Sequence, residues 1–134
     1  MRLGRAWHAL LEHGSDAPVD EIARAHALTP EQLDTVVRAA ARVRAAHGDF
    51  FGSRDAAELE LVSDNGELLR VDRLVERDDA VWIIDFKWQV TDAERSAYEV
   101  QVRRYANVLR SLRSDRTLRI GLVTAAGELI EVSS

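Results

Sequence analysis

The sequence predicts an α/β fold, in which helices flank a mixed β-sheet and a separate helical segment precedes it. Residues 3–48 carry apolar side chains at helical spacing, whereas residues 57–87 and 117–132 contain the short apolar or alternating runs that are typical of strands. One long amphipathic stretch, 92–112, separates the two groups of strands. A helix between neighbouring strands implies a crossover connection. We therefore expect parallel as well as antiparallel pairs within one sheet.

Three helices are expected in the N-terminal segment. The first covers residues 3–13. The second begins at Pro18 and runs to about residue 27. The third follows Thr29-Pro30-Glu31-Gln32, which combines a capping box with a proline at the first helical position, and it ends at Gly48. These signals place all three helices ahead of the sheet.

Three strands are expected before the long helix and two after it. The tetrapeptide Ser63-Asp64-Asn65-Gly66 predicts a hairpin between the first two strands, because Asn-Gly favours the tight turns of β-hairpins. Short connections make the first three strands an antiparallel meander. The long helix starts at the capping box Thr91-Asp92-Ala93-Glu94. The expected strands cover residues 57–62, 67–75, 81–87, 117–124 and 128–132.

Charged groups lie inside two of these otherwise apolar strands. Asp72 interrupts the strand at 67–75, while Asp85 and Lys87 end the most hydrophobic run of the sequence. Alternate residues of a strand share a face, so Asp85 and Lys87 point the same way, with the backbone carbonyl of Phe86 between them. A lone buried charge would be costly here. We therefore expect these groups to form one polar cluster.

This cluster has the composition of a metal-dependent hydrolytic site. The carboxylates of Asp72 and Asp85, with the carbonyl of Phe86, are the hard oxygen ligands that Mg²⁺ or Mn²⁺ prefers. The ammonium group of Lys87 can orient an attacking water or balance charge that develops on phosphate oxygens. The alternative is a buried structural ion pair between Asp72 and Lys87, with Asp85 only ending a strand. The short motif alone does not decide between them, because such motifs recur by chance.

Further motifs surround the cluster in a fixed order. They are Gly4-Arg5-Ala6-Trp7-His8 followed by Leu11-Glu12, then Asp72, then Asp85-Phe86-Lys87, then Tyr98, Gln101 and Tyr105. This order resembles the RecB-like nuclease domain of the PD-(D/E)XK superfamily, found at the C-terminus of UvrD/Rep-type (RecB/AddA-like) helicase-nucleases. The resemblance covers residues 4–105 and implies a restriction-endonuclease-like core. One departure is Leu69, at a position where the family commonly has glycine.

The resemblance implies a role for each residue of the central motifs. Asp72 and Asp85 would bind Mg²⁺ or Mn²⁺ together with the ring of His8 and the backbone carbonyl of Phe86. Lys87 would act on the attacking water and the scissile phosphate. For His8, the alternative is a histidine that is only packed beside its neighbours.

Accessory roles follow from the same resemblance. Gln101 would hold the catalytic lysine or the water. Tyr105 would pack or contact the DNA backbone, with a place in the core as its alternative, and Tyr98 is the second tyrosine of this segment. Glu58, at the start of the first strand, matches a glutamate that lies near the metal centre in the family; a solvated edge position is its alternative.

Length and composition indicate one ordinary globular domain. The chain has 134 residues, of which 46% are hydrophobic and 31% are charged. We expect a single domain, 1–134, with the helical segment in 1–48 and the sheet and crossover helix in 57–134. No apolar run approaches the roughly 20 residues that cross a bilayer, so we expect a cytoplasmic protein without a membrane partner. The absence of cysteine excludes thiolate metal sites and the iron-sulfur variant of this nuclease branch.

The charge balance indicates which partners to expect. A net charge of −5 and a pI near 5.4 are unfavourable for a stand-alone DNA binder, because phosphate contacts require basic groups. The resemblance implies that a helicase motor, in cis or as a partner subunit, delivers the DNA. We therefore expect a fragment of a larger helicase-nuclease: a divalent-metal-dependent DNA nuclease, an exonuclease that acts in DNA recombination and repair. The alternative is a catalytically silent, nuclease-like module that binds DNA or docks a helicase.

Overall fold

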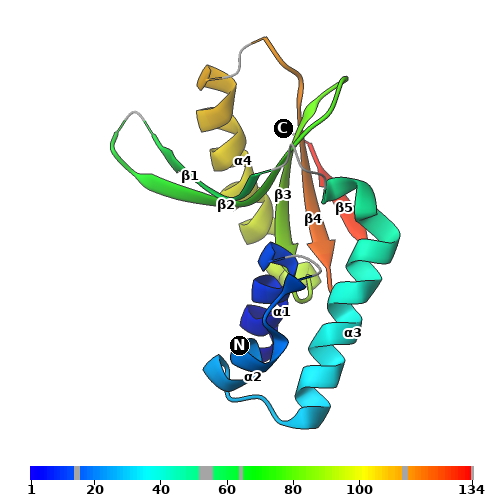
Figure 1. Cartoon of the computed structure of the whole chain (residues 1–134). Coiled ribbons are helices and arrows are strands. Elements are labelled where there is room, and N and C mark those ends of the chain that lie inside the picture. Colours follow the sequence, from blue (N-terminus) through cyan, green and yellow to red (C-terminus); the bar gives the residue numbers. More distant parts are fainter. Residues whose placement is uncertain (14–15, 52–55, 64, 113–114, 134) are drawn as a thin grey trace.

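The computed structural model of the chain describes residues 1–13, 16–51, 56–63, 65–112 and 115–133, and only the backbone of residues 56–58. It is a mixed α/β structure in which a twisted five-stranded sheet has helices on both faces (Figure 1). Helices α1 (Arg2–His13) and α3 (Pro30–His47) lie on one face, and α4 (Asp92–Leu112) lies on the other. The expected fold class, a mixed sheet flanked by helices, is thus confirmed.

The N-terminal helices begin and end close to the expected positions. Between α1 and α3 lies a short helix, α2 (Val19–Ala25), which Pro18 precedes as its N-cap residue. The expected capping box of α3 is present, because the Thr29 hydroxyl accepts from the backbone N–H of Gln32 and the Gln32 side chain accepts from the backbone N–H of Thr29. A single 3₁₀ turn, Gly48–Phe50, then leads towards the sheet.

The strands follow one another across the sheet in chain order. β1 pairs antiparallel with β2, and β2 pairs antiparallel with β3. Helix α4 then crosses over and returns the chain parallel to β3 as β4, and β5 pairs antiparallel with β4. This is the predicted meander followed by a crossover. The strand bounds are β1 (Ala56–Val62), β2 (Leu68–Glu76), β3 (Val81–Lys87), β4 (Leu118–Thr124) and β5 (Leu129–Val132).

The first hairpin turn follows its sequence signal in the residues that are described. Gly66 has a φ of 83°, a conformation that glycine adopts without strain, and its N–H donates to the carbonyl of Ser63 at 2.9 Å. Asp64, which the sequence also places in this turn, lies outside the described residues.

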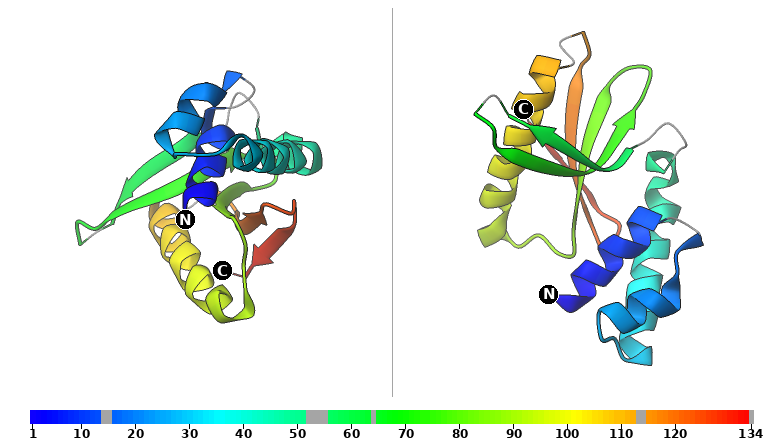
Figure 2. Two further views of the ribbon diagram at one scale, coloured as in Figure 1. Left: turned by 90° about the horizontal axis from the view of Figure 1, so that it is seen from below. Right: turned by 60° about the vertical axis from the view of Figure 1, so that its left-hand side comes forward.

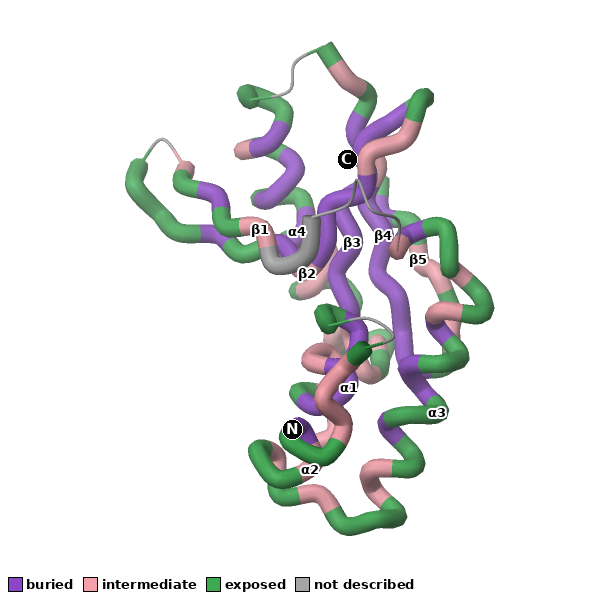
Figure 3. The backbone as a smooth tube through the Cα atoms, viewed as in Figure 1, coloured by how far each residue is buried: buried purple, intermediate pink, exposed green. Residues whose placement is uncertain are grey.

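Each face of the sheet carries its own apolar cluster. Along β3, Ile84 and Phe86 pack towards α1 and α3, whereas Val81 and Ile83 pack towards α4. This alternation directs Asp85 and Lys87 towards the α4 face. Figure 3 shows that β3 and β4 are buried along most of their length. β3 is thus the centre of the core, and its last residues bring polar groups to the edge of both clusters.

Strand β2 departs from strict alternation at Asp72. Val71 and Leu74 belong to the same cluster, on the α4 side, although their odd spacing would place them on opposite faces of a regular strand. The pairing between β2 and β3 ends at Arg73 and Ile84. Beyond that pair the β1–β2 hairpin turns away from the other strands (Figure 2). Asp72 is therefore the first β2 residue in the gap where the two strands separate.

None of the helices in the described part of the chain is long and apolar enough to cross a membrane.

Candidate active site

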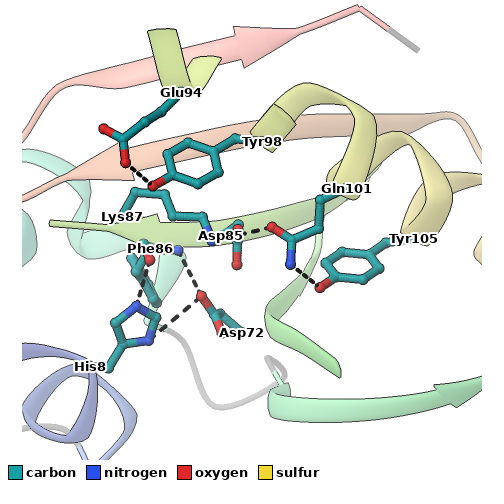
Figure 4. A network of polar contacts seen from close by, with 9 residues as sticks. All are labelled: His8, Asp72, Asp85, Phe86, Lys87, Glu94, Tyr98, Gln101 and Tyr105. Carbon is teal, nitrogen blue, oxygen red and sulfur yellow. Dashed lines mark hydrogen bonds and ion pairs between the residues drawn. The ribbon is translucent and has the colours of Figure 1, made fainter. Parts of the chain in front are cut away.

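The residues predicted to act together lie at the gap between β2 and β3. Asp72 comes from β2, Asp85 and Lys87 come from the end of β3, His8 comes from α1, and Gln101 comes from α4. Figure 4 shows their side chains gathered around the end of β3. The fold thus brings together the five side chains that the sequence assigned to the catalytic and metal-binding roles.

Asp72 replaces the missing backbone pairing between the two strands. Its Oδ2 accepts a hydrogen bond of 2.9 Å from the backbone N–H of Phe86, and the same oxygen lies 3.6 Å from Nδ1 of His8. The side chain is 17% exposed. Asp72 is therefore fixed in the gap and contacts the α1 side of the sheet through His8.

Asp85 is the most deeply buried charged group of the site. Its side chain is only 5% exposed, and its Oδ2 lies 3.0 Å from Nζ of Lys87. That contact is an ion pair, since no hydrogen bond from the described residues reaches this oxygen with suitable geometry. A buried carboxylate oxygen without a hydrogen bond is unfavourable. The ammonium of Lys87 is therefore the partner of this oxygen in the described structure.

The two carboxyl groups are coupled. Burial, followed by the hydrogen bond and the negative charge of Asp85, raises the pKa of Asp72 well above its usual value, against the opposing effects of the Phe86 N–H and of Lys87. Two carboxyl groups this close do not both ionise readily, so the pair retains a proton at neutral pH. A divalent cation could replace that proton, because it neutralises both charges.

Lys87 is held by contacts on several sides. Besides Asp85, its Nζ donates to Oε1 of Gln101 at 3.2 Å and lies 4.6 Å from the ring centroid of Tyr98. The other end of the Gln101 amide donates to the hydroxyl of Tyr105 at 2.9 Å, which fixes the orientation of the amide. The orientation of the Lys87 ammonium is therefore fixed by the hydrogen bonds that run from Tyr105 through Gln101 of α4.

The two tyrosines have different environments. Tyr105 is 7% exposed and belongs to the apolar cluster under α4, so its position agrees with the core alternative. Burial and the charges of Asp85 and Asp72 raise the pKa of Tyr105, which keeps its hydroxyl neutral. Tyr98 donates to Oε2 of Glu94 at 2.8 Å, and this hydrogen bond is the main cause that raises the pKa of Tyr98. Tyr98 remains partly exposed beside Lys87.

His8 and the carbonyl of Phe86, both predicted metal ligands, contact each other directly. Nε2 of His8 lies 2.5 Å from this carbonyl oxygen, so the ring donates its Nε2 proton there. The ring is also packed edge-on against Trp7 and Phe86. At the start of the same helix, a side chain on Gly4 would meet Trp88, the residue after Lys87, at 3.4 Å. This is an ordinary van der Waals distance, so the start of α1 lies directly beside the chain that follows β3.

The donor set suits a hard divalent cation, but the groups are not arranged as a complete cage. Within the described ranges, no three His, Asp or Glu side chains form a group that could hold a metal ion. The available donors are two coupled carboxylates, one of which has an oxygen without a hydrogen bond, and a backbone carbonyl. These match the oxygen ligands of Mg²⁺ or Mn²⁺. Because Nε2 of His8 donates to the carbonyl of Phe86, Nδ1, which lies 3.6 Å from Asp72, is the nitrogen that could bind a cation.

One further acidic residue lies at the site. A hollow of about 10 Å³, roughly the space of one water molecule, is lined by His8, Glu12, Asp72 and Phe86. Glu12 was part of the sequence motif but received no role. Its spacing of one helical turn after His8 is the signal that could have placed it here. The predicted accessory role of Glu58 concerns a side chain outside the described residues.

A larger cavity lies elsewhere on the α4 side. It has a volume of about 370 Å³ and is lined by the tip of the β1–β2 hairpin and the C-terminal half of α4, including Glu67 and Arg104, which form an ion pair. Neither carboxylate of the site borders it. We therefore do not connect it with the chemistry of the site.

Comparison with models of known protein families finds no match for this chain, and comparison with curated proteins finds none either. The residues and the geometry of the site are therefore the basis for its function.

Proposed function

We propose that this chain is a divalent-metal-dependent DNA nuclease domain of the RecB-like PD-(D/E)XK type. It would act as an exonuclease coupled to a helicase in DNA recombination and repair. The observation that carries this proposal is the coupled pair of Asp72 and Asp85 beside an anchored lysine. Two carboxylates and a lysine from neighbouring strands can supply the metal ligands and the positive charge that metal-assisted phosphodiester hydrolysis uses.

The cation would be held by Asp72, Asp85 and the backbone carbonyl of Phe86, with His8 as the nitrogen ligand. The buried Oδ2 of Asp85, which lacks a hydrogen bond within the described structure, supports this assignment. When bound, Mg²⁺ or Mn²⁺ supplies charge that polarises the scissile phosphate and lowers the pKa of a bound water.

Lys87 would stabilise negative charge on the phosphate during hydrolysis. Its ammonium is 3.0 Å from Asp85 and 3.2 Å from Gln101, so it is already oriented before the substrate arrives. A preoriented charge requires no reorganisation during the reaction, which makes it more effective than a flexible one. Gln101 is therefore a positioning residue, and Tyr105 supports it.

The net charge of −5 supports the helicase part of the proposal. Free affinity for DNA depends mainly on the phosphates that a protein neutralises. A domain with a surplus of acidic groups gains most from a tethered motor that raises the local concentration of the strand.

One observation favours a second candidate, a nuclease-like module that binds DNA or docks a helicase without cutting. The described residues form no complete group of three His, Asp or Glu ligands that could hold a metal ion. A module of this kind would retain the fold and the ion pairs but would bind no catalytic cation.

The substitution Asp85→Asn separates the two candidates. We expect it to reduce Mg²⁺-dependent degradation of linear DNA by more than about 100-fold, because changes even outside the direct ligands of a metal cost 10- to 100-fold. Its thermal midpoint should stay unchanged or rise, since the variant removes carboxylate repulsion. Asp78→Asn, in the exposed turn before β3, is the matched control. Full activity of Asp85→Asn would exclude the nuclease mechanism.

Calorimetric titration with Mn²⁺ supplies the second arm. If the chain is a nuclease, the wild type should show one Mn²⁺-binding event that is lost in Asp72→Ala. If the chain is a catalytically silent module, the heat of the Mn²⁺ titration should be the same for both proteins.

A further inference from the structure

Two cavities lie on either side of the candidate site. The first, which we call the lysine-side cavity, has a volume of about 320 Å³ and is lined by Lys87, Trp88, Tyr98, Arg5 and His8, among others. Its lining includes the aromatic rings of Phe86, Trp88 and Tyr98, the cationic groups of Arg5 and Lys87, and one carboxylate, Glu94. Aromatic rings and cations together suit a nucleotide, because bases stack on rings and phosphates pair with cations. Its volume lies at the small end of ligand pockets, which fits a single nucleotide.

The second, which we call the aspartate-side cavity, has a volume of about 460 Å³ and is lined by Asp72, Arg70, His26, Arg5 and His8, among others. Aromatic side chains other than histidine are not part of its lining. Its basic groups would contact the backbone phosphates of a DNA strand. Phosphate contacts position nucleic acid without reading its sequence. The two cavities thus offer different chemistry to the two sides of a phosphodiester bond.

Arg5 and His8 line both cavities. The hollow beside Asp72 shares His8 with them and lies at the site itself. A strand that leaves one cavity and enters the other would therefore pass Arg5 and the carboxylates in succession. This arrangement makes Arg5 the cationic side chain that both halves of such a path have in common.

The guanidinium of Arg5 is available for a ligand. Arg5 is exposed, and its side chain makes no ion pair or hydrogen bond with the described part of the protein. Other arginines nearby are already engaged: Arg70 pairs with Glu60 at 3.2 Å, and Arg2 donates to the carbonyl of Ala27 at 3.1 Å. An unpaired arginine in the wall of two cavities is well suited to phosphate, which its planar donors match.

We infer that Arg5 binds a backbone phosphate of a DNA strand that crosses the site from the lysine-side cavity to the aspartate-side cavity. The inference rests on the proposed nuclease function for its substrate class, but it assigns a binding role that the catalytic groups do not include. On the lysine side, the adjacent nucleotide lies beside Tyr98 and Trp88.

The binding test uses a fluorescein-labelled, single-stranded thymidine oligonucleotide in EDTA, where no metal-dependent cleavage occurs. Anisotropy titrations at several low salt concentrations should show that Arg5→Ala weakens binding by about tenfold, the loss expected for one charge-assisted contact. The slope of log affinity against log salt should fall by about 0.7, which corresponds to one phosphate contact on a single strand. Arg5→Lys should retain most of the affinity, because it keeps the charge.

Arg24→Ala is the matched control. Arg24 is also an exposed arginine without a side-chain contact to the described residues, on α2, and it lines neither cavity. This control should leave both affinity and slope unchanged. The inference would be overturned if Arg5→Ala and Arg24→Ala weakened DNA binding equally, or if neither weakened it. It would also be overturned if the wild type did not bind the oligonucleotide.

A kinetic arm with Mg²⁺ separates this inference from the proposed function. In an active wild type, Arg5→Ala should raise KM several-fold and change kcat little, whereas damage to the site through His8 would lower kcat. If the wild type is inactive with both Mg²⁺ and Mn²⁺, the nuclease function is contradicted. The role of Arg5 is then still tested by the binding measurement in EDTA. An unchanged KM in Arg5→Ala would reject the role of Arg5 while the nuclease function stands.

Discussion

The two faces of the sheet contribute to the site in different ways. The α1–α3 face is rich in aromatic contacts, and its polar contribution to the proposed ligands is His8, on a helix far from the strands in sequence. The α4 face supplies a connected polar chain from Lys87 through Gln101 to Tyr105. Asp72 contacts both, because it lies in the gap where β2 leaves β3.

The two halves of the site are stabilised in different ways. On the α4 side, hydrogen bonds between side chains fix the lysine. On the α1 side, the contacts of the His8 ring with the Phe86 carbonyl and with Asp72 depend on how the helix packs. Damage to packing should therefore affect the two sides unequally.

The largest expected effect comes from a matched pair of core truncations. Leu11 is fully buried in the cluster under α1, and Leu109 is 2% exposed in the cluster under α4. Leu11→Ala and Leu109→Ala should each lower the free energy of unfolding by about 2–5 kcal/mol, measured by urea denaturation. At a temperature where both remain folded, only Leu11→Ala should also lower nuclease activity. Equal losses of activity would show that the α1 side is no more dependent on packing than the α4 side.

The next effect concerns the carboxylate that contacts both faces. Asp72 has a raised pKa in the folded, metal-free protein, chiefly because it is buried and next because Asp85 is beside it. A carboxyl with a raised folded pKa contributes stability fully below its unfolded pKa, and this stability is lost as pH rises through the folded value. In EDTA, the wild type should therefore lose stability relative to Asp72→Asn as the pH rises from the pKa of an unfolded aspartate towards the raised pKa of folded Asp72.

Urea denaturation at several pH values measures this difference. Asp78→Asn, a change of the same kind in an exposed turn, should remain parallel to the wild type. If the Asp72→Asn curve is also parallel, the coupling between Asp72 and Asp85 is absent. Added Mn²⁺ should restore stability at high pH in the wild type and not in Asp72→Asn, because the cation takes the place of the proton.

The smallest expected effect tests the polar chain of the α4 face. Gln101→Ala should lower kcat by about tenfold, because Lys87 loses the hydrogen bond to Gln101 and keeps the ion pair with Asp85 and the contact with the Tyr98 ring. The thermal midpoint should change little. Asn107→Ala, an exposed amide further along the same helix, should retain full activity. Equal activity of the two variants would show that Lys87 is positioned without Gln101.

Local patterns in the sequence accounted for most of the fold. The period of the apolar residues, the Thr29 capping box and the Asn65-Gly66 turn each act over a few residues, so they are readable without the rest of the chain. The crossover helix between β3 and β4 followed from the order of the elements. For the same reason, the shared direction of Asp85 and Lys87 was predictable, since it depends only on the period of one strand.

Contacts between distant elements were decided only by the tertiary structure. The sequence predicted a site role for His8, but it did not predict that the ring would donate a hydrogen bond to the carbonyl of Phe86. For Tyr105 it left a DNA contact and a place in the core as alternatives, and the structure buries this side chain in the core. The sequence predicted that Asp72 and Asp85 lie in one cluster, but nothing local predicts that Asp72 would lie where β2 separates from β3, or that Arg5 would line two cavities. The physical reason is that such contacts depend on the twist of the sheet and on the packing of α1 and α4 against it. These are properties of the whole assembled chain, whereas strand period and helix caps arise from neighbouring residues alone.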